Sequence, residues 1–243
     1  MNKEVYEELK KIQNIHWWFV AKREIVLDMF EHFCQLKPLP KILDVGCGMG
    51  LMLESLQEYG EVYGVDASYD AVEYCQNKWG KNIIQGTLPG NISFEKGSFD
   101  VVVALDVLEH IDDDKAALHE CYELLNKDGV MLITVPALNC LWGYNDVAVQ
   151  HKRRYNKQDL ISKCKQEGFK IEKCSYYNFW LSGPIWLVRK VKNILKIEKD
   201  DMQGKVRDNF INKILYRIFS SEKFHLRRGG YPFGVSLILV AKK

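Results

Sequence analysis

Short apolar segments alternate with amphipathic helical segments along most of this chain, beginning near residue 41. The run 99–105 is rich in valine, which is typical of a strand buried on both faces. We predict strands over 41–45, 61–65, 82–85, 99–105, 130–135, 169–176 and 235–241. We predict intervening helices over 51–59, 68–79, 114–126 and 156–167. Strands that alternate with helices form βαβ units, so the pattern predicts a three-layer, Rossmann-like α/β fold with a seven-stranded, mostly parallel sheet.

Two helical segments fall outside this alternation. Residues 1–35 carry apolar side chains at helical spacing, which predicts an N-terminal helical lid. Residues 184–220 contain two amphipathic patterns, which predict a helical insertion before the last strand. A chain of 243 residues is long enough for one large domain. We therefore predict a single domain over 1–243, with the lid over 1–35, a core over 36–178 and 230–243, and the insert over 179–229.

The charges are distributed unevenly, although 34 Lys+Arg and 32 Asp+Glu give a net charge of only +2. Residues 1–150 hold 12 basic and 24 acidic side chains, whereas residues 151–243 hold 22 and 8. Such an asymmetry predicts an anionic partner for the basic half: a phosphorylated substrate, a membrane surface or a nucleic acid. Nucleic acid is the least favoured, because no known binding module occurs and the pI of 8.1 is below that of a typical nucleic-acid-binding domain.

Seven cysteines without a C-x-x-C pair argue against a disulfide framework and against a zinc site, so we predict no metal. The first residues lack the apolar core of a secretory signal, and no run approaches the roughly 18 apolar residues of a membrane-spanning helix. We expect a cytoplasmic protein, either free or attached to the membrane from the cytoplasmic side.

A glycine loop follows the first predicted strand in the sequence KILDVGCGMG at 41–50. Glycines let the backbone turn tightly and let a ligand approach closely. The dinucleotide fingerprint G-x-G-x-x-G fails, because its third glycine would fall at Leu51. No G-K-[ST] follows either, which excludes a P-loop. A G-x-G-x-G loop remains, preceded by Asp44.

With these residues the chain resembles the class I S-adenosylmethionine-dependent methyltransferases. Asp44 and the loop match the family's first motif, Asp66 matches the acid that ends its second strand, and residues 106–110 (DVLEH) match its fourth motif. The resemblance implies S-adenosylmethionine as cofactor, S-adenosylhomocysteine as product, and Asp66 as the acceptor of the ribose hydroxyls. Residues 85–89 (QGTLP) lack the acid that many relatives use for the adenine amino group. The implied cofactor-binding residues are Asp44, Gly46, Cys47, Gly48, Gly50, Asp66, Ala67, Thr87, Leu88, Leu105, Asp106 and His110.

Candidate acceptor residues follow the fifth predicted strand, where the carboxyl edge of the sheet is expected. This stretch is aromatic and basic, which suits a sugar or an anionic group. We predict that Trp18, Trp142, Asn145, Arg153, Arg154 and Tyr155 bind substrate. His151 is the first choice for a general base, followed by Asp106 and Asp146. The alternative for Arg153 and Arg154 is ion pairing with the acidic half of the same domain.

The segments HWWF at 16–19 and HKRRY at 151–155 resemble a bacterial subgroup of small-molecule methyltransferases. The resemblance implies methyl transfer to an oxygen or nitrogen of a small molecule, with a sugar or lipid-linked glycan intermediate as the leading acceptor. The alternatives are a quinone-precursor O-methyltransferase, an RNA methyltransferase and a cofactor-binding protein without turnover. Amphipathic basic helices within 179–220 are compatible with peripheral membrane contact, with a cap over the acceptor pocket or with a homodimer face.

Overall fold

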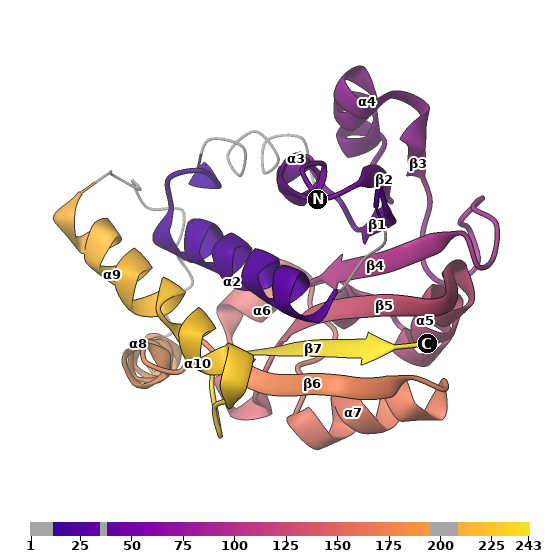
Figure 1. Cartoon of the computed structure of the whole chain (residues 1–243). Helices are drawn as coiled ribbons and strands as arrows, with labels where there is room; N and C mark the ends of the chain where they lie inside the picture. Colours follow the sequence, from indigo (N-terminus) through magenta and orange to yellow (C-terminus); the bar gives the residue numbers. More distant parts are fainter. Residues whose placement is uncertain (1–11, 35–37, 195–208) are drawn as a thin grey trace.

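A seven-stranded sheet forms the centre of the computed structural model, which describes residues 12–34, 38–194 and 209–243 (Figure 1). Its strand order is β3-β2-β1-β4-β5-β7-β6. The strands are β1 (Lys41–Val45), β2 (Glu61–Asp66), β3 (Ile83–Gln85), β4 (Phe99–Leu105), β5 (Leu125–Pro136), β6 (Lys170–Tyr177) and β7 (Ser236–Lys242). Neighbouring strands are parallel, except that β7 is antiparallel to β5 and β6. The predicted Rossmann-like, mostly parallel sheet is therefore confirmed.

Helices cover both faces of the sheet. From β1 the chain passes through β2 to β3 in one direction, and β4 leads to β5 in the other. Because crossovers between parallel strands are right-handed, helices of the two halves must lie on opposite faces. The helices between these strands are α3 (Leu51–Leu56), α4 (Tyr69–Trp79), α5 (Asp114–Leu124), α6 (Tyr144–Ala148) and α7 (Lys157–Gln166), with 3-10 turns at Gly80–Asn82, Leu108–His110 and Asn139–Leu141.

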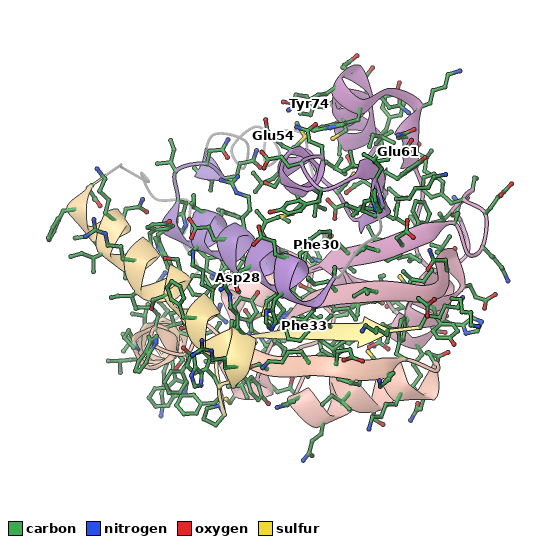
Figure 2. The ribbon with its side chains drawn as sticks, viewed as in Figure 1. Asp28, Phe30, Phe33, Glu54, Glu61 and Tyr74 are labelled. Atoms are coloured by element: carbon green, nitrogen blue, oxygen red, sulfur yellow. The ribbon has the colours of Figure 1, made fainter. Side chains whose placement is uncertain are left out.

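Helix α2 (Trp17–Phe33) is packed into the fold. Its residues Ala21, Ile25 and Met29 are fully buried, and the ring of Phe30 packs 5.1 Å from that of Tyr59. Figure 2 shows Asp28 and Phe30 on this helix. The part of the predicted lid that the structure describes is thus covered by other elements, while residues 1–11 and 35 of that prediction lie outside the described residues.

The predicted insert contributes α8 (Ser182–Ile194), α9 (Phe210–Ser220) and α10 (Glu222–Arg228). The helix α10 was not anticipated; its Arg227 Nε donates to Asp28 of α2 at 2.9 Å. Helix α9 lies against α2 (Figure 1), and the ring of Trp17 packs 5.8 Å from that of Phe219. Residues 195–208 of the insert lie outside the described residues. Helices α2, α9 and α10 therefore pack together, although α2 is remote in sequence from the other two.

Three predicted boundaries are wrong. The helix predicted over 51–59 ends at Leu56. The helix predicted to end at residue 126 ends at Leu124, and β5 begins at Leu125 instead of Val130. Asp128-Gly129, a sequence typical of a turn, lies within β5 near a register shift opposite Phe99 and Val101. A strand that includes a bulge tolerates such residues. Among the helices of the described residues, none combines the length and apolar character needed to cross a bilayer.

Candidate active site

The glycine loop follows β1 at the point where the strand order reverses, between β1 and β4. Open α/β sheets bind ligands at this place. Gly46 has φ +70° and a side chain there would meet Val107 at 2.5 Å, so no other residue fits. Gly48 has φ +51° with no atom within 4 Å of the position of a Cβ. The loop therefore leaves an open cradle lined by backbone.

Asp66, at the end of β2, holds this loop in place. Its Oδ2 accepts from the backbone N–H of Gly48 at 2.8 Å, and its Oδ1 accepts from that of Ser68 at 2.9 Å. A carboxylate has about four acceptor positions, so each oxygen can accept one more hydrogen bond. Asp66 can thus orient the loop and receive two ligand hydroxyls at the same time.

The crevice beside the loop is acidic, with one buried cation. Burial, followed by the charge of Asp66, raises the pKa of Asp44 to about 8. The ammonium of Lys22, from α2, bonds Asp106 Oδ2 and lies 5.1 Å from the centre of the Trp18 ring. Burial alone would raise the pKa of Asp106, but the charge and hydrogen bond of Lys22 hold that pKa below its usual value. Charge in this crevice is therefore set jointly by the sheet and by α2.

Asp106 begins a tight turn directly after β4. It has φ +55°, which is uncommon for a residue other than glycine. Its backbone N–H donates to Thr134 O at 2.9 Å, and the hydroxyl of Thr134 donates to its Oδ1 at 3.0 Å. The turn is thus fixed by β5, and the next residues form the 3-10 turn Leu108–His110.

His151 lies between two buried carboxylates. Its Nδ1 is 2.9 Å from Asp146 Oδ1, and its Nε2 is 3.8 Å from Glu109 Oε1. The ring of His110 packs 4.9 Å from that of His151. Glu109 is fully buried and neither of its carboxylate oxygens has a hydrogen-bond partner. Burial, followed by the charge of Asp106, raises the pKa of Glu109 well above its usual value.

Asp146 is a positioning residue within a buried network. Besides His151 it binds Arg154, whose Nε donates to Oδ1 at 2.8 Å, and Oδ2 accepts from Gly143 N–H at 2.9 Å. Arg154 also donates to Ala137 O at 2.8 Å. Burial acts to raise the pKa of Asp146, but the His151 hydrogen bond and the Arg154 charge hold it below its usual value. Asp146 therefore holds His151 at its Nδ1.

Arg154 and Tyr155 correct the prediction of substrate binding. The guanidinium of Arg154 is buried in the Asp146 network. The hydroxyl of Tyr155, itself buried, donates to Asp114 Oδ2 at 2.7 Å. Arg153 NH1 is 3.2 Å from Asp114 Oδ2, and its NH2 donates to Asp112 O. These partners belong to the acidic half, as the alternative interpretation held.

The remaining predicted residues lie around the crevice. Trp18 is half-buried at the start of α2, Asn145 is half-buried on α6, and Trp142 is exposed just before α6. Among the predicted cofactor residues the structure leaves Ala67 and Thr87 exposed, Leu88 and Leu105 half-buried, and Cys47 buried beneath the loop. Contact of any of them with a ligand stays a prediction.

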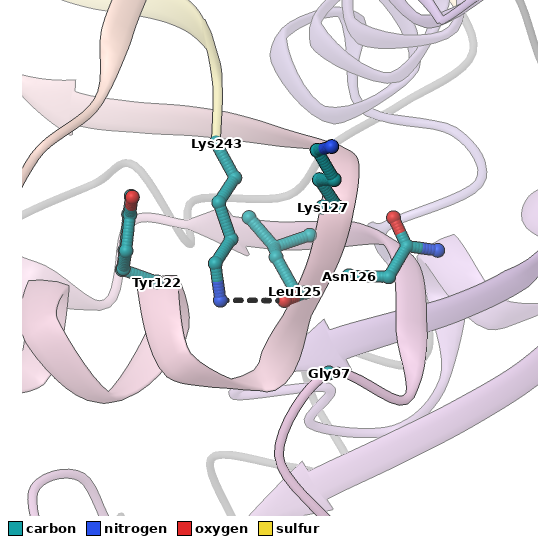
Figure 3. A pocket seen from close by; sticks show the side chains of 6 residues that line it. All are labelled: Gly97, Tyr122, Leu125, Asn126, Lys127 and Lys243. Atoms are coloured by element: carbon teal, nitrogen blue, oxygen red, sulfur yellow. Dashed lines mark hydrogen bonds between the residues drawn. The ribbon is translucent and has the colours of Figure 1, made fainter.

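A separate depression lies at the opposite edge of the sheet (Figure 3). It is lined by Gly97, Tyr122, Leu125, Asn126, Lys127 and Lys243, where β5 begins and β7 ends. The Lys243 ammonium donates to Leu125 O at 2.8 Å. Because ligands of α/β sheets bind at the carboxyl ends of the parallel strands, we do not assign this depression to catalysis.

Comparison with known proteins identifies the family. Residues 43–133, which include the glycine loop, Asp66 and the turn at Asp106, match the model of a methyltransferase domain. The chain carries a class I S-adenosylmethionine-dependent methyltransferase domain. Its cofactor is accordingly S-adenosylmethionine.

Relatives of this methyltransferase domain include the ubiquinone biosynthesis O-methyltransferase of Pelagibacter ubique, 32% identical over 117 residues, which are 46% of this chain and 49% of that protein. The matches to the first curated relatives span between half and three quarters of their lengths. A SAM-dependent methyltransferase of Archaeoglobus fulgidus shares the fold, with TM-score 0.56, 22% identity and coverage of 91% and 94% of the two chains. So does phosphoethanolamine N-methyltransferase 2 of Haemonchus contortus, solved with S-adenosylhomocysteine, with TM-score 0.57, 20% identity and coverage of 90% and 52%.

The residues of the methyltransferase site fit the cofactor. Open space at Gly48 admits a ligand against the loop backbone, and Asp66 retains acceptor capacity for two hydroxyls. The carboxylate of Asp106, whose pKa is held below its usual value, suits a ligand that is positively charged at sulfur. Asp66, the glycine loop and Asp106 are the residues that would hold the cofactor.

Sequence analysis missed two residues of the methyltransferase site, Lys22 and Glu109. Lys22 lies one turn before Ile25, Val26 and Met29 on the same face of α2. A lysine at a position that continues an apolar stripe is the signal that could have revealed it. Glu109 was part of the DVLEH segment, but only its burial without a hydrogen-bond donor distinguishes it from a surface acid.

Proposed function

We propose that this methyltransferase transfers a methyl group from S-adenosylmethionine to a hydroxyl oxygen of a small-molecule acceptor, and that His151 activates that hydroxyl. The observation that carries the proposal is the arrangement of His151, whose Nδ1 is 2.9 Å from Asp146 Oδ1 while its Nε2 lies 3.8 Å from Glu109 Oε1, beyond hydrogen-bond distance. An imidazole held in this way has one nitrogen left to accept a proton. A hydroxyl needs such activation to become a good nucleophile, which favours oxygen over nitrogen.

The chemistry divides between the cofactor and this chain. Bound S-adenosylmethionine supplies a methyl group on a positively charged sulfur, and S-adenosylhomocysteine is left when that methyl has moved. The acceptor oxygen forms the new bond to carbon, and its proton passes to Nε2 of His151. Asp146 stabilises the resulting imidazolium at Nδ1, as its ion pair with Arg154 keeps it ionised. Holding the acceptor oxygen in line with the methyl group can lower the barrier by roughly 7–11 kcal/mol.

For the acceptor class, two observations support a lipid-linked molecule with a sugar or quinone-precursor hydroxyl. The relative from Pelagibacter ubique is named as an O-methyltransferase of ubiquinone biosynthesis. Helices α8 and α9, both on the left of Figure 1 and away from α4, expose a large set of apolar side chains. These are Trp186, Leu187, Val188, Val191, Phe210, Ile211, Ile214 and Ile218. We call this set the α8–α9 apolar surface.

The α8–α9 apolar surface is bordered by basic residues, including Lys190, Lys213 and Arg217. Phe210 is 77% exposed, and large exposed apolar patches on soluble proteins often mark an interaction site. Apolar side chains with a basic border match an anionic membrane surface, where lysine and arginine are each worth about 1 kcal/mol. We therefore propose that the α8–α9 apolar surface rests on anionic lipid and brings the site to a lipid-linked acceptor.

The His151→Ala variant tests the proposed activation. We expect turnover to fall by about 10²–10⁴-fold, because a positioned base contributes that much. Affinity for S-adenosylhomocysteine, measured by calorimetry, should stay within twofold of the wild type. His119→Ala, which changes an exposed histidine on α5, is the matched control and should behave as the wild type. Unchanged turnover in His151→Ala would remove His151 from the mechanism.

The same assay separates the alternatives. Labelled cofactor is incubated with candidate hydroxyl acceptors, with RNA and without acceptor. Methylated small molecule supports the proposal, methylated RNA supports an RNA methyltransferase, and cofactor binding without any product supports a binding protein without turnover.

Sedimentation with lipid vesicles tests the membrane contact. We expect the chain to bind phosphatidylcholine vesicles that contain 30% phosphatidylglycerol (chosen as the anionic lipid), and to bind less at high salt. The double variant Trp186→Glu/Phe210→Glu should bind at least about tenfold more weakly, since burying each ring is worth about 1.5–3 kcal/mol. Tyr69→Glu, an exposed ring on α4, is the control and should bind as the wild type. Equal binding of the double variant and the wild type would contradict the contact.

A further inference from the structure

Three potential ligand atoms come together beside the methyltransferase site. Glu109, His110 and His151 each offer one such atom, and all three atoms lie within 4.8 Å of one another. Glu109 and His110 come from the 3-10 turn after β4, and His151 comes from the segment after α6. Residues that are distant in sequence are thus held together by the fold at one point.

Glu109 supplies an independent indication that something is bound at this point. Its side chain is fully buried, and both carboxylate oxygens lack any hydrogen-bond partner. The nearest ring nitrogen, His151 Nε2, is 3.8 Å from Oε1, which is too long for a hydrogen bond. Buried polar groups are nearly always partnered, because an unmade hydrogen bond costs about 1–3 kcal/mol. A partner for the Glu109 carboxylate is therefore expected, and the described residues do not provide one.

We infer that Glu109, His110 and His151 form a binding site for a divalent transition-metal cation such as Mn²⁺ or Zn²⁺. Two imidazoles and one carboxylate are a common protein ligand set for catalytic metals and leave coordination positions open. Ligands about 2.0–2.2 Å from an ion lie roughly 3–3.5 Å apart, so the three side chains need to close in by about 1 Å. Asp106 is not part of the set, because Lys22 and Thr134 engage its oxygens.

The second contact of His151 supports this assignment. Metal-binding histidines usually donate their other N–H to a carboxylate, which fixes the tautomer. Nδ1 of His151 faces Asp146 in this way at 2.9 Å, and Arg154 fixes Asp146 in turn. A backbone hydrogen bond also connects the segment of His151 to the turn of Glu109, because the Lys152 N–H donates to Glu109 O at 2.8 Å. The cluster is therefore preorganised.

This inference rests on the proposed methyl transfer to a hydroxyl, and it replaces one step of that proposal, the uptake of the acceptor's proton by Nε2 of His151. A nitrogen that binds a cation cannot take up the acceptor's proton. Instead, the acceptor hydroxyl would bind at an open position of the cation, which lowers the hydroxyl's pKa, and its proton would leave to water. The methyl group then moves from sulfur to oxygen as before. Without a cation, His151 activates the acceptor directly by taking up its proton. With the cation, His151 activates the acceptor by holding the metal that binds it.

Metal binding by the purified full-length chain tests the inference without any acceptor. The protein is treated with a chelator, and the chelator is then removed. The protein is titrated with MnCl₂, and electron paramagnetic resonance measures the free Mn²⁺ at each step. Mn²⁺ is the sharper probe, because the chain also has cysteines that can bind Zn²⁺. We expect one Mn²⁺ per chain, and Glu109→Gln should weaken its binding at least 30-fold. Glu95→Gln changes an exposed acid and should bind as the wild type.

His110→Ala protects the test against misfolding of the Glu109 variant, because His110 is exposed. It should bind Mn²⁺ at least tenfold more weakly while its thermal unfolding stays unchanged. Absence of stoichiometric Mn²⁺ in the wild type, or equal affinity in both variants, overturns the inference. Methyl transfer that is insensitive to chelation also overturns it, yet leaves the proposed function standing. Bound Mn²⁺ without methyl transfer to any hydroxyl contradicts the proposed function alone.

Discussion

Replacing Asp66 with alanine is expected to weaken cofactor binding by about 100-fold, which corresponds to about 2.7 kcal/mol. The carboxylate accepts from the backbone of Gly48 and Ser68, and it is the acceptor that we propose for two ribose hydroxyls. Hydrogen bonds to a charged group are worth about 1.5–3 kcal/mol each. Loss of Asp66 therefore removes the ligand contact and loosens the loop that forms the cradle. Calorimetric titration with S-adenosylhomocysteine measures the effect.

Two further variants make the result interpretable. Asp66→Asn keeps one oxygen for the Gly48 N–H and loses the charge, so its affinity should fall between those of the wild type and Asp66→Ala. Asp70→Ala removes an exposed acid in the first turn of α4 and should bind as the wild type. If Asp66→Ala binds within threefold of the wild type, the ribose is held elsewhere and the role proposed for Asp66 is wrong.

Replacing Asp146 with alanine is expected to lower the free energy of unfolding by about 3–5 kcal/mol. The guanidinium of Arg154 is almost completely buried, and without Asp146 its charge has no counter-ion in the network. The variant also frees the Gly143 N–H and Nδ1 of His151. For a chain of this size each kcal/mol lowers Tm by about 2–4 °C, so we expect a fall of roughly 8–15 °C. Urea unfolding and calorimetry measure the change.

Asp112→Ala is the matched control for Asp146→Ala. Asp112 pairs with Lys152, but its side chain is 87% exposed, and exposed ion pairs contribute little. Its loss should change the free energy of unfolding by less than about 0.5 kcal/mol. The double variant Asp146→Leu/Arg154→Met removes both charges and should recover much of the lost stability, because no buried charge is then unpaired. A double variant no more stable than Asp146→Ala would show that the loss of stability comes from the missing hydrogen bond to the Gly143 N–H at the start of α6, and not from the unpaired charge of Arg154.

Secondary structure followed from the sequence wherever local patterns decide it. The valine-rich segment over 99–105 became β4 with the predicted bounds, and the first strand was also placed correctly. The start of β5 was misplaced because Asp128-Gly129 reads as a turn, whereas pairing with β4 extends the strand through it. Helix α10 was missed because its buried residues contact α2 and β6, which are remote in sequence. Local signals cannot report contacts of this kind.

The cofactor part of the site was predictable for the same reason. Gly46, Gly48 and Asp66 follow strands directly, and parallel strands bring their carboxyl ends to one edge. The acceptor part was predictable only as a region. Arg153, Arg154 and Tyr155 are consecutive in the sequence, and only the packing shows that the last two are buried. Whether an arginine faces a ligand or an internal carboxylate depends on residues far away along the chain.

By itself, the sequence determined the parallel α/β sheet, the glycine loop with its acid and the unequal charge of the two halves, since period, turn chemistry and charge are properties of neighbouring residues. Tertiary structure alone decided which charges meet. Much of the basic half pairs with the acidic half, through Arg154 and Asp146 or Lys163 and Asp114, and α2 brings Lys22 to Asp106. The fold also left Glu109 without a partner beside two histidines. Charge pairing acts over a few ångströms in space, and only the folded chain determines which residues are that close.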